Sequence, residues 1–386
     1  MLRLLFLLLP IAAIAGWYAG FKQQHPEQHG SKNKSGGISP DYLLGLNYLI
    51  NEQPDKAVDV FIKMLEVNDD TAETHIALGS LFRRRGEVDR AIRIHQNLIA
   101  RPQLSGEQRA RGLYELGQDY LRAGVLDRAE NIFLELVGIG KDTKASYHCL
   151  LNIYQLQKDW QQAIAIAKKL SSKEKAQMGV QIAHYYCELA EKAYKNKDVE
   201  TAIANLEKAL LADAKCVRAN MLFGNFAYAA GEYADAIRYY RQVKDQDSAY
   251  LSEALVPLAK CYAALNKEAD FLSYLEKSLK KAKQLPVILA LAHELQKLRG
   301  ADVAIEFLTH TMDQHLSLRS VYYLLGLYIE KSAGNTKEQL IHLQSFLQKI
   351  LENNPTYSCS HCGFAGKSFY WQCPGCRKWS TLHRTG

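Results

Sequence analysis

The sequence predicts an all-α protein, in which a superhelix of paired helices follows one transmembrane helix and precedes a small metal-binding module. Three observations support this fold class: an apolar run at residues 1–20, a helical pattern repeated over residues 39–352, and four cysteines within residues 355–386. The 386 residues are 48% hydrophobic, which is ample for a large core. The net charge of +7 is mild for this length and does not by itself indicate nucleic-acid binding.

Residues 1–20 form the expected transmembrane anchor. They are apolar apart from Arg3, and their length is close to that needed to cross a bilayer. A cleaved signal peptide is the alternative, because the most apolar part is short and Ala13–Ala15 resembles a small-residue cleavage site.

Residues 21–38 read as a flexible tether that also sets the orientation. Three lysines, Lys22, Lys32 and Lys34, follow the anchor with only Glu27 opposing them, so the positive-inside rule places the body of the chain in the cytoplasm. The eight cysteines also support a cytoplasmic location, because free thiols and thiolate ligands persist in a reducing compartment. An exported protein is the competing localisation.

Residues 39–352 repeat one pattern, in which Leu-Gly is followed three residues later by Tyr or Phe and then by Ala-x-x-x-aromatic. Clear copies centre on Gly45, Gly79, Gly117, Leu151 and Gly224, and weaker ones on Ala190, Ala259, Ala292 and Gly326. In chain order the spacings are 34, 38, 34, 39, 34, 35, 33 and 34 residues. This period and pattern resemble the tetratricopeptide repeat, and predict a tetratricopeptide-repeat superhelix of eight or nine helix pairs.

The pattern has a simple physical reading. A small residue on the first helix lets the second helix approach closely, and the aromatic residue fills the space between repeats. Most Leu, Ala and Tyr residues are therefore expected in the core. Four further cysteines lie in these apolar stretches and are expected to be small buried residues: Cys149, Cys187, Cys216 and Cys261.

The first helices of the pairs line the concave face of such a superhelix, and their polar residues are the candidate partner contacts. By the repeat register these are Arg84, Arg111, Gln118, Arg122, Asn152, Arg218 and Asn225. Four arginines along one groove would suit an acidic peptide or protein segment. For each residue taken singly, an ordinary solvated surface position is the alternative.

The metal module is predicted from two matched pairs, Cys359-x-x-Cys362 and Cys373-x-x-Cys376, separated by ten residues. Each turn directs two thiolates at one point, and four soft sulfurs suit a tetrahedral ion. A redox C-x-x-C motif normally occurs once, beside a βαβ pattern that this sequence lacks. We therefore predict one bound metal ion, Zn²⁺ for a structural site in a reducing compartment, with iron as the alternative.

The module is also rich in aromatic residues and free of carboxylates. Five aromatics lie between and after the cysteine pairs, more than a thirty-residue domain buries alone, so some are expected to pack on the last repeats or on a partner. A short hinge at Pro355 permits docking against the helix at residues 339–351. A basic zinc ribbon that binds nucleic acid is the second interpretation, although no nucleic acid is expected.

No catalytic function is expected. The sequence contains no phosphate-binding glycine loop, no H-E-x-x-H motif and no G-x-S-x-G motif. Four cysteine ligands also close the metal site and leave no position for a catalytic water.

The order of anchor, tether, repeat array and four-cysteine module resembles the lipopolysaccharide assembly protein B family. The residues that carry the resemblance are Gly86–Gln96 and Tyr370–Arg377. The resemblance implies a rubredoxin-like module, with the four cysteines as metal ligands. The gap between the pairs is shorter than in true rubredoxins, so the correspondence is with the two metal-binding turns and not with an electron-transfer domain.

The resemblance also implies a function. It suggests a single-pass inner-membrane adaptor, mostly cytoplasmic, that works with the membrane protease FtsH to promote degradation of the deacetylase LpxC and so restrains lipopolysaccharide synthesis. A scaffold for other envelope-biogenesis enzymes is the alternative. The oligomeric state stays open, with a homo-oligomer among the possibilities.

Overall fold

The computed structural model describes residues 40–51, 53, 56, 57, 60, 72–281, 284–312 and 317–385. The predicted anchor at 1–20 and the tether at 21–38 lie outside these residues. Within the described part, no helix combines the length and the apolar character needed to span a bilayer.

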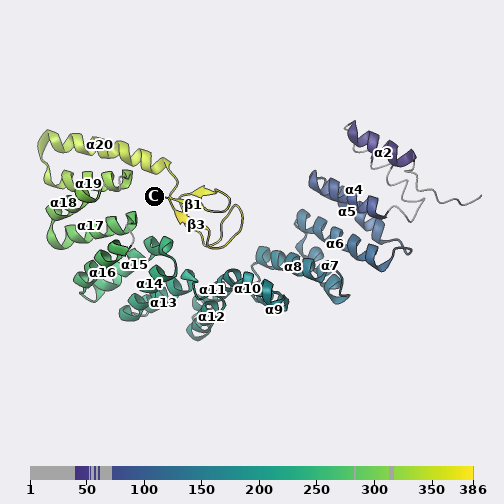
Figure 1. Ribbon diagram of the computed structural model, residues 1–386, viewed down its shortest axis with the longest axis horizontal. Helices are drawn as coiled ribbons and strands as arrows, with labels where there is room; N and C mark the ends of the chain where they lie inside the picture. The colour runs from purple at the N-terminus through teal and green to yellow at the C-terminus, as the bar shows by residue number, and fades with distance from the viewer. Residues whose placement is uncertain are drawn as a thin grey trace, which may run out of the picture.

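The described helices follow one another along a curved array, and the C-terminal strands lie inside the curve (Figure 1). The helices are α2 (Pro40–Ile50), α4 (Ala72–Arg84), α5 (Val88–Ile99), α6 (Gly106–Ala123), α7 (Leu126–Gly138), α8 (Thr143–Gln157), α9 (Trp160–Lys169), α10 (Ser172–Gln177), α11 (Gly179–Lys195), α12 (Val199–Ala212), α13 (Val217–Ala229), α14 (Tyr233–Gln246), η2 (Ser248–Tyr250), α15 (Leu251–Ala264), α16 (Glu268–Lys281), α17 (Leu285–Arg299), α18 (Ala301–Met312), α19 (Leu318–Lys331) and α20 (Gly334–Asn353). The mostly helical repeat fold is as predicted.

The array is built from antiparallel pairs, each packed on the next. From α4 to α20 the described residues form eight consecutive pairs, with the short helices α10 and η2 inserted in the connections before α11 and α15. Many first helices end in a tight turn: Gly124, for example, caps α6 in the left-handed conformation, with φ +78°. Each pair buries its apolar faces on its neighbours, and the core therefore runs along the whole array.

Glycines on three first helices set the spacing within their pairs. A Cβ added to Gly117 would lie 2.8 Å from the ring of Phe133, and one added to Gly224 would lie 2.5 Å from the ring of Tyr240. The aromatic rings occupy the space that the missing side chains leave, as the repeat pattern predicts. Phe133 and Tyr240 are almost completely buried there.

The pair α4–α5 places a histidine where the other two pairs have an aromatic core residue. His95 is fully buried against Gly79, and its Nδ1 lies 2.5 Å from Oδ2 of the equally buried Asp119 on α6. The other carboxylate oxygen of Asp119 accepts a hydrogen bond from Arg83, 2.7 Å away, and Arg83 also binds Glu115 at 2.5 Å. This polar network fastens the α4–α5 pair to α6, and its buried carboxylate is satisfied on both oxygens.

The four cysteines of the array are buried, as expected. Burial raises the pKa of Cys261 to about 11, so its thiol is neutral at physiological pH. Two of the four contact each other: the sulfurs of Cys187 on α11 and Cys216 at the start of α13 lie 3.9 Å apart.

Replacing Gly117 by alanine should destabilise the array by about 1–3 kcal/mol, because the new Cβ would overlap the Phe133 ring. Helix propensity alone would predict the opposite change in the free energy of unfolding, because alanine stabilises an open helical position by up to about 1 kcal/mol relative to glycine. Gly138→Ala is the matched control, because nothing lies within 4 Å of a Cβ at that position. Thermal unfolding followed by circular dichroism measures both; stabilisation of both variants would contradict the close approach of α6 and α7.

Candidate metal centre and the docked module

The C-terminal module is a small antiparallel sheet that carries two cysteine turns. Its strands are β1 (Tyr357–Cys359), β2 (Ala365–Gly366) and β3 (Leu382–Arg384), in the order β2-β1-β3. The first turn connects β1 to β2, and the second lies between Gln372 and Trp379, which form an isolated antiparallel bridge. The first turn is therefore flanked by the sheet and the second by this bridge, and the flanking backbone pairs fix where the sulfurs point.

The two turns have the same backbone geometry. The N–H of Gly363 donates to the carbonyl of Cys359 at 3.0 Å, and the N–H of Arg377 donates to the carbonyl of Cys373 at 2.8 Å. The residue after each pair is left-handed, with φ +74° at Gly363 and +58° at Arg377. Glycine adopts this conformation freely, whereas an arginine there is held by its surroundings.

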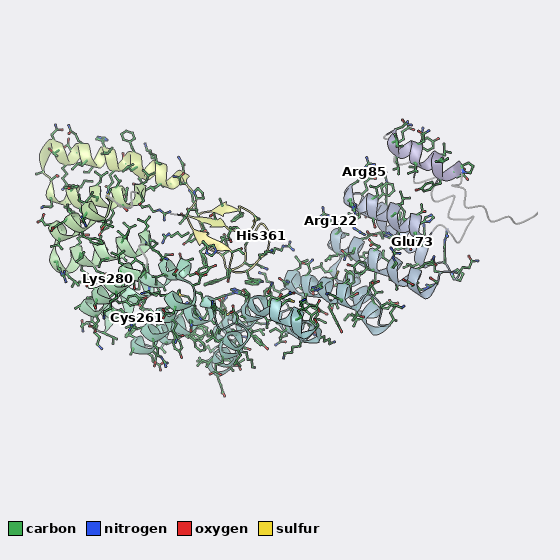
Figure 2. The ribbon with its side chains drawn as sticks, viewed as in Figure 1. Glu73, Arg85, Arg122, Cys261, Lys280 and His361 are labelled. Atoms are coloured by element: carbon green, nitrogen blue, oxygen red, sulfur yellow. The ribbon has the colours of Figure 1, made fainter. Side chains whose placement is uncertain are left out.

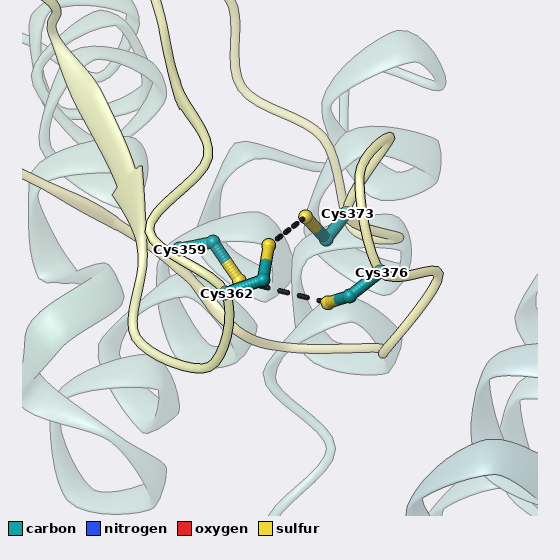
Figure 3. A group of neighbouring side chains, drawn as sticks. All are labelled: Cys359, Cys362, Cys373 and Cys376. Carbon is teal, nitrogen blue, oxygen red and sulfur yellow. Dashed lines mark hydrogen bonds between the residues drawn. The ribbon is translucent and has the colours of Figure 1, made fainter.

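The two turns bring all four sulfurs together (Figure 3). The Cys359 and Cys376 sulfurs lie 3.8 Å apart, the Cys362 and Cys373 sulfurs 3.7 Å apart, and all four lie within 4.8 Å of one another. Four sulfurs about 2.3 Å from a common tetrahedral ion would be separated by about 3.8 Å. The donor set therefore fits a single tetrahedral metal ion.

The electrostatics of the sulfurs also fit a cation. Burial raises the pKa of Cys359, but its hydrogen-bond contacts with the Thr381 side chain and with the N–H groups of Cys362 and His361 outweigh this effect and bring the pKa to about 5. A hydrogen bond from the N–H of Phe364 lowers the pKa of Cys362, yet desolvation and the neighbouring sulfurs raise it to about 12. The lowered pKa of Cys359 and the raised pKa of Cys362 show that a thiolate at the first position makes one at the second harder to form, and a bound cation removes this repulsion.

The module is docked in the concave side of the array through its tryptophans. Trp379 stacks on His184 of α11, with ring centroids 4.6 Å apart and 17° between planes, and its edge meets Trp160 of α9. The guanidinium carbon of Arg218 lies 5.8 Å from the Trp379 ring centroid. Next to this stack, Nε2 of His184 and the Ser380 hydroxyl are in hydrogen-bond contact at 2.7 Å. Trp379 is therefore part of the core of the array.

A second contact lies at η2 and α15. The Tyr250 ring packs 5.5 Å from Trp371 and 6.0 Å from Phe369, measured between centroids, and the Tyr357 hydroxyl donates to Glu253 at 3.0 Å. The short connection after α20 permits docking against residues 339–351, but the module makes its aromatic contacts on other helices. The aromatic pockets lie on α9, α11 and η2, which precede the module by more than a hundred residues.

Four of the predicted concave residues line one cavity of about 730 Å³: Arg84, Gln118, Arg122 and Asn152. They lie on α4, α6 and α8, and Figure 2 shows Arg122 on the inner side of the curve. Arg377 of the module lines the same cavity. The structure therefore joins part of the predicted groove to the second cysteine turn.

The other three predicted residues are elsewhere. Arg218 is only 4% exposed and binds Glu188 and Glu191, both at 2.8 Å, beneath Trp379, so its prediction as a free groove contact was wrong. The docked module covers it, which the repeat register alone does not reveal. Arg111 is exposed and pairs with Glu73 at 2.6 Å. The side chain of Asn225 accepts a hydrogen bond from the Tyr240 hydroxyl at 2.7 Å.

Two residues of this region were not singled out as candidate contacts. The sequence could have indicated Arg377, because this exposed residue directly follows the metal-site cysteine Cys376. His184 has no such local signal, since its role depends on Trp379, nearly two hundred residues later. Its pKa is lowered to about 3 by burial and by the nearby charge of Arg218, so the ring is neutral when stacked.

Acid should weaken the docking through His184. Its folded-state pKa is about 3 against 6.5 for the free side chain, so the stabilisation is complete above pH 6.5 and declines as the pH falls towards 3. Lowering the pH from 7.5 to 5 should therefore cost about 2 kcal/mol through this group. A His184→Phe variant should lose this part of the pH dependence of stability, because phenylalanine does not titrate. Urea titrations followed by tryptophan fluorescence compare the two proteins; an identical pH dependence in both would contradict the assignment.

Comparison with known families agrees with this architecture. Residues 357–384 match a family described as a rubredoxin metal binding domain. Residues 74–107 and 187–250 match tetratricopeptide repeat families. The repeat array and the metal-binding module predicted from the sequence are thus both confirmed.

Relatives extend the match to the whole chain. Lipopolysaccharide assembly protein B of Escherichia coli (strain K12) is 38% identical over 383 residues, covering 99% of this chain and 98% of that protein. The protein of the same name from Haemophilus influenzae is 35% identical over 391 residues, covering 99% and 98%. On this full-length similarity, the chain belongs to the lipopolysaccharide assembly protein B family.

Proposed function

We propose that the chain is a membrane-tethered adaptor without catalytic activity of its own. It restrains lipopolysaccharide synthesis by presenting an LpxC-type deacetylase to an FtsH-type membrane protease. Family membership supports the link to lipopolysaccharide assembly, because the relatives carry that name. The protease and the deacetylase come from the resemblance described above.

The observation that carries this proposal is the docked module. Repeat arrays present extended concave surfaces to protein segments. Here the metal module is seated in that concave side through Trp379 and Tyr250, so the array and the module form one continuous surface. Two elements fixed relative to each other are what an adaptor needs to hold a protease and its substrate in a constant arrangement.

The metal acts structurally in this proposal. Zn²⁺ suits four cysteine ligands in a reducing compartment, and iron is the alternative. When bound, the ion supplies a fixed tetrahedral centre that joins the two turns. The residues of the chain orient the ligands and dock the module: the sheet orients the sulfurs, and the tryptophans hold the module in the array. Loss of the ion should therefore release the second turn and its neighbour Trp379.

The predicted anchor at 1–20 and tether at 21–38 complete the proposal. A single-pass inner-membrane anchor with the array in the cytoplasm would confine the adaptor to the plane in which a membrane protease works. Confinement of this kind raises the effective concentration of one partner for the other.

Removing the metal ligands should stabilise the deacetylase. In a strain whose only copy carries Cys373→Ser and Cys376→Ser, we expect the half-life of the LpxC-type enzyme to lengthen several-fold after protein synthesis is stopped. Immunoblots measure this, normalised to the abundance of the variant. Cys149→Ser is the control, because that cysteine lies outside the metal site. Normal turnover in a strain with normal amounts of a folded, metal-free variant would sink the proposal.

The orientation is tested separately. A cysteine introduced as Lys141→Cys, in the exposed turn after α7, should resist a membrane-impermeant maleimide in cells with a permeabilised outer membrane. It should react once the inner membrane is opened. Labelling before that step, alongside a periplasmic thiol as positive control, would place the array outside the cytoplasm.

A further inference from the structure

The cavity between the first described pairs and the module has a distinctive lining. It is bounded by α4, α6, the start of α7, α8 and the second cysteine turn, and encloses about 730 Å³. We call it the arginine groove. Its charged and polar lining residues are Arg83, Arg84, Arg122, Arg377, Gln118 and Asn152, and none of its lining residues is acidic.

Three of the four arginines have no carboxylate partner among the described residues. Arg83 is neutralised within the wall by Glu115 and Asp119. In contrast, Arg84, Arg122 and Arg377 are exposed and form none of the ion pairs found in the described part of the chain. Three guanidinium groups therefore converge on one concave space without a counter-charge. Such an arrangement favours an anionic occupant.

The rest of the lining indicates what kind of anion. Leu121, Leu126 and Leu156 add apolar surface, and the side-chain amide of Asn152 can bond to a peptide backbone. Carboxylates pair with the planar arginine fork, and apolar side chains can contact the leucines. The mixture matches a short peptide segment in which acidic residues alternate with apolar ones.

Nucleic acid fits the same surface less well. Single-stranded nucleic acids bind through exposed aromatic rings on which bases stack. The module's rings Trp371, Trp379 and Phe369 are instead committed to the array. None of the groove's lining residues is aromatic.

We propose that the arginine groove binds an acidic, partly apolar segment of a protein partner, and that the metal module supplies one of its three unpaired cations. This inference rests on the proposed adaptor function and names the chemistry of the segment the adaptor would recognise. It also links the metal to recognition. Arg377 follows the ligand Cys376, and its N–H is bonded to the carbonyl of Cys373, so the folded turn sets where its side chain lies.

The test uses the detergent-solubilised full chain loaded with zinc and a fluorescein-labelled twelve-residue peptide of Glu, Asp, Leu and Ser. The second probe is the same peptide with Gln and Asn in place of Glu and Asp. Fluorescence anisotropy at low salt should give at least about tenfold tighter binding of the acidic peptide, and added salt should reduce the difference. Equal affinity for the two peptides would overturn the proposal.

Two substitutions locate the binding. Arg122→Gln and Arg377→Asn should each weaken binding of the acidic peptide by about three- to tenfold. Asparagine is chosen for the second because it tolerates the left-handed backbone. Arg93→Gln is the matched control, an exposed arginine on α5 outside the groove, and should leave affinity unchanged. Circular dichroism and zinc content check that each variant is folded.

The remaining outcomes are decisive in the same way. If Arg122→Gln and Arg377→Asn bind as wild type does, or if single-stranded DNA competes better than the acidic peptide, the groove is not a site for acidic segments. The proposed function is judged by deacetylase turnover in cells. Lost peptide binding with normal turnover would support the groove as a peptide site while refuting its use by the adaptor. Normal turnover in the metal-free strain, with peptide binding retained, would refute the adaptor alone.

Discussion

The stacking of Trp379 on His184 is the contact on which the rest of the structure depends. It places Trp379 of the C-terminal module in the core of the helical array, where the side chain also contacts Trp160 and Arg218 of the array. Buried aromatic contacts of this kind combine a large apolar area with defined geometry. Through this contact the second cysteine turn lies beside α6 and α8, and Arg218 is withdrawn from the concave surface. Without it, the module would be held on the array by the connection after α20 and by the contacts at Tyr250 and Glu253.

Sequence reasoning succeeded where the determining contacts are local or periodic. The pairing of Gly117 with Phe133 follows from one repeat, and the convergence of the four sulfurs follows from the spacing of two short turns. It failed where two distant segments meet. Arg218 has the right register for the concave face, but only the docked module decides that it is buried. The position of the docked module could not be predicted for the same reason, because nothing near Pro355 encodes the pocket between α9 and α11.

The polar network around Asp119 gives the arginine groove a firm wall. Arg83 is held by Glu115 and Asp119, and Asp119 is held by His95, so the end of α4 is fastened to α6. Arg84 extends from this fixed end, and Arg122 extends from the same α6. A surface fixed before binding loses less conformational freedom when a partner binds. The replacement of a core aromatic by His95 in this repeat therefore also prepares the neighbouring surface.

The contact between His184 and Ser380 spans 196 positions of the chain. Repeat arrays fold through contacts between neighbours, so α4 to α19 can form progressively during synthesis. The module differs, because its partners on α9 and α11 are made long before it. Until Trp379 has left the ribosome, the apolar pocket around Tyr185 and Trp160 lacks this side chain and faces solvent. Docking is therefore a late step of high contact order, and it closes both the pocket around Tyr185 and Trp160 and the aromatic contact at Tyr250.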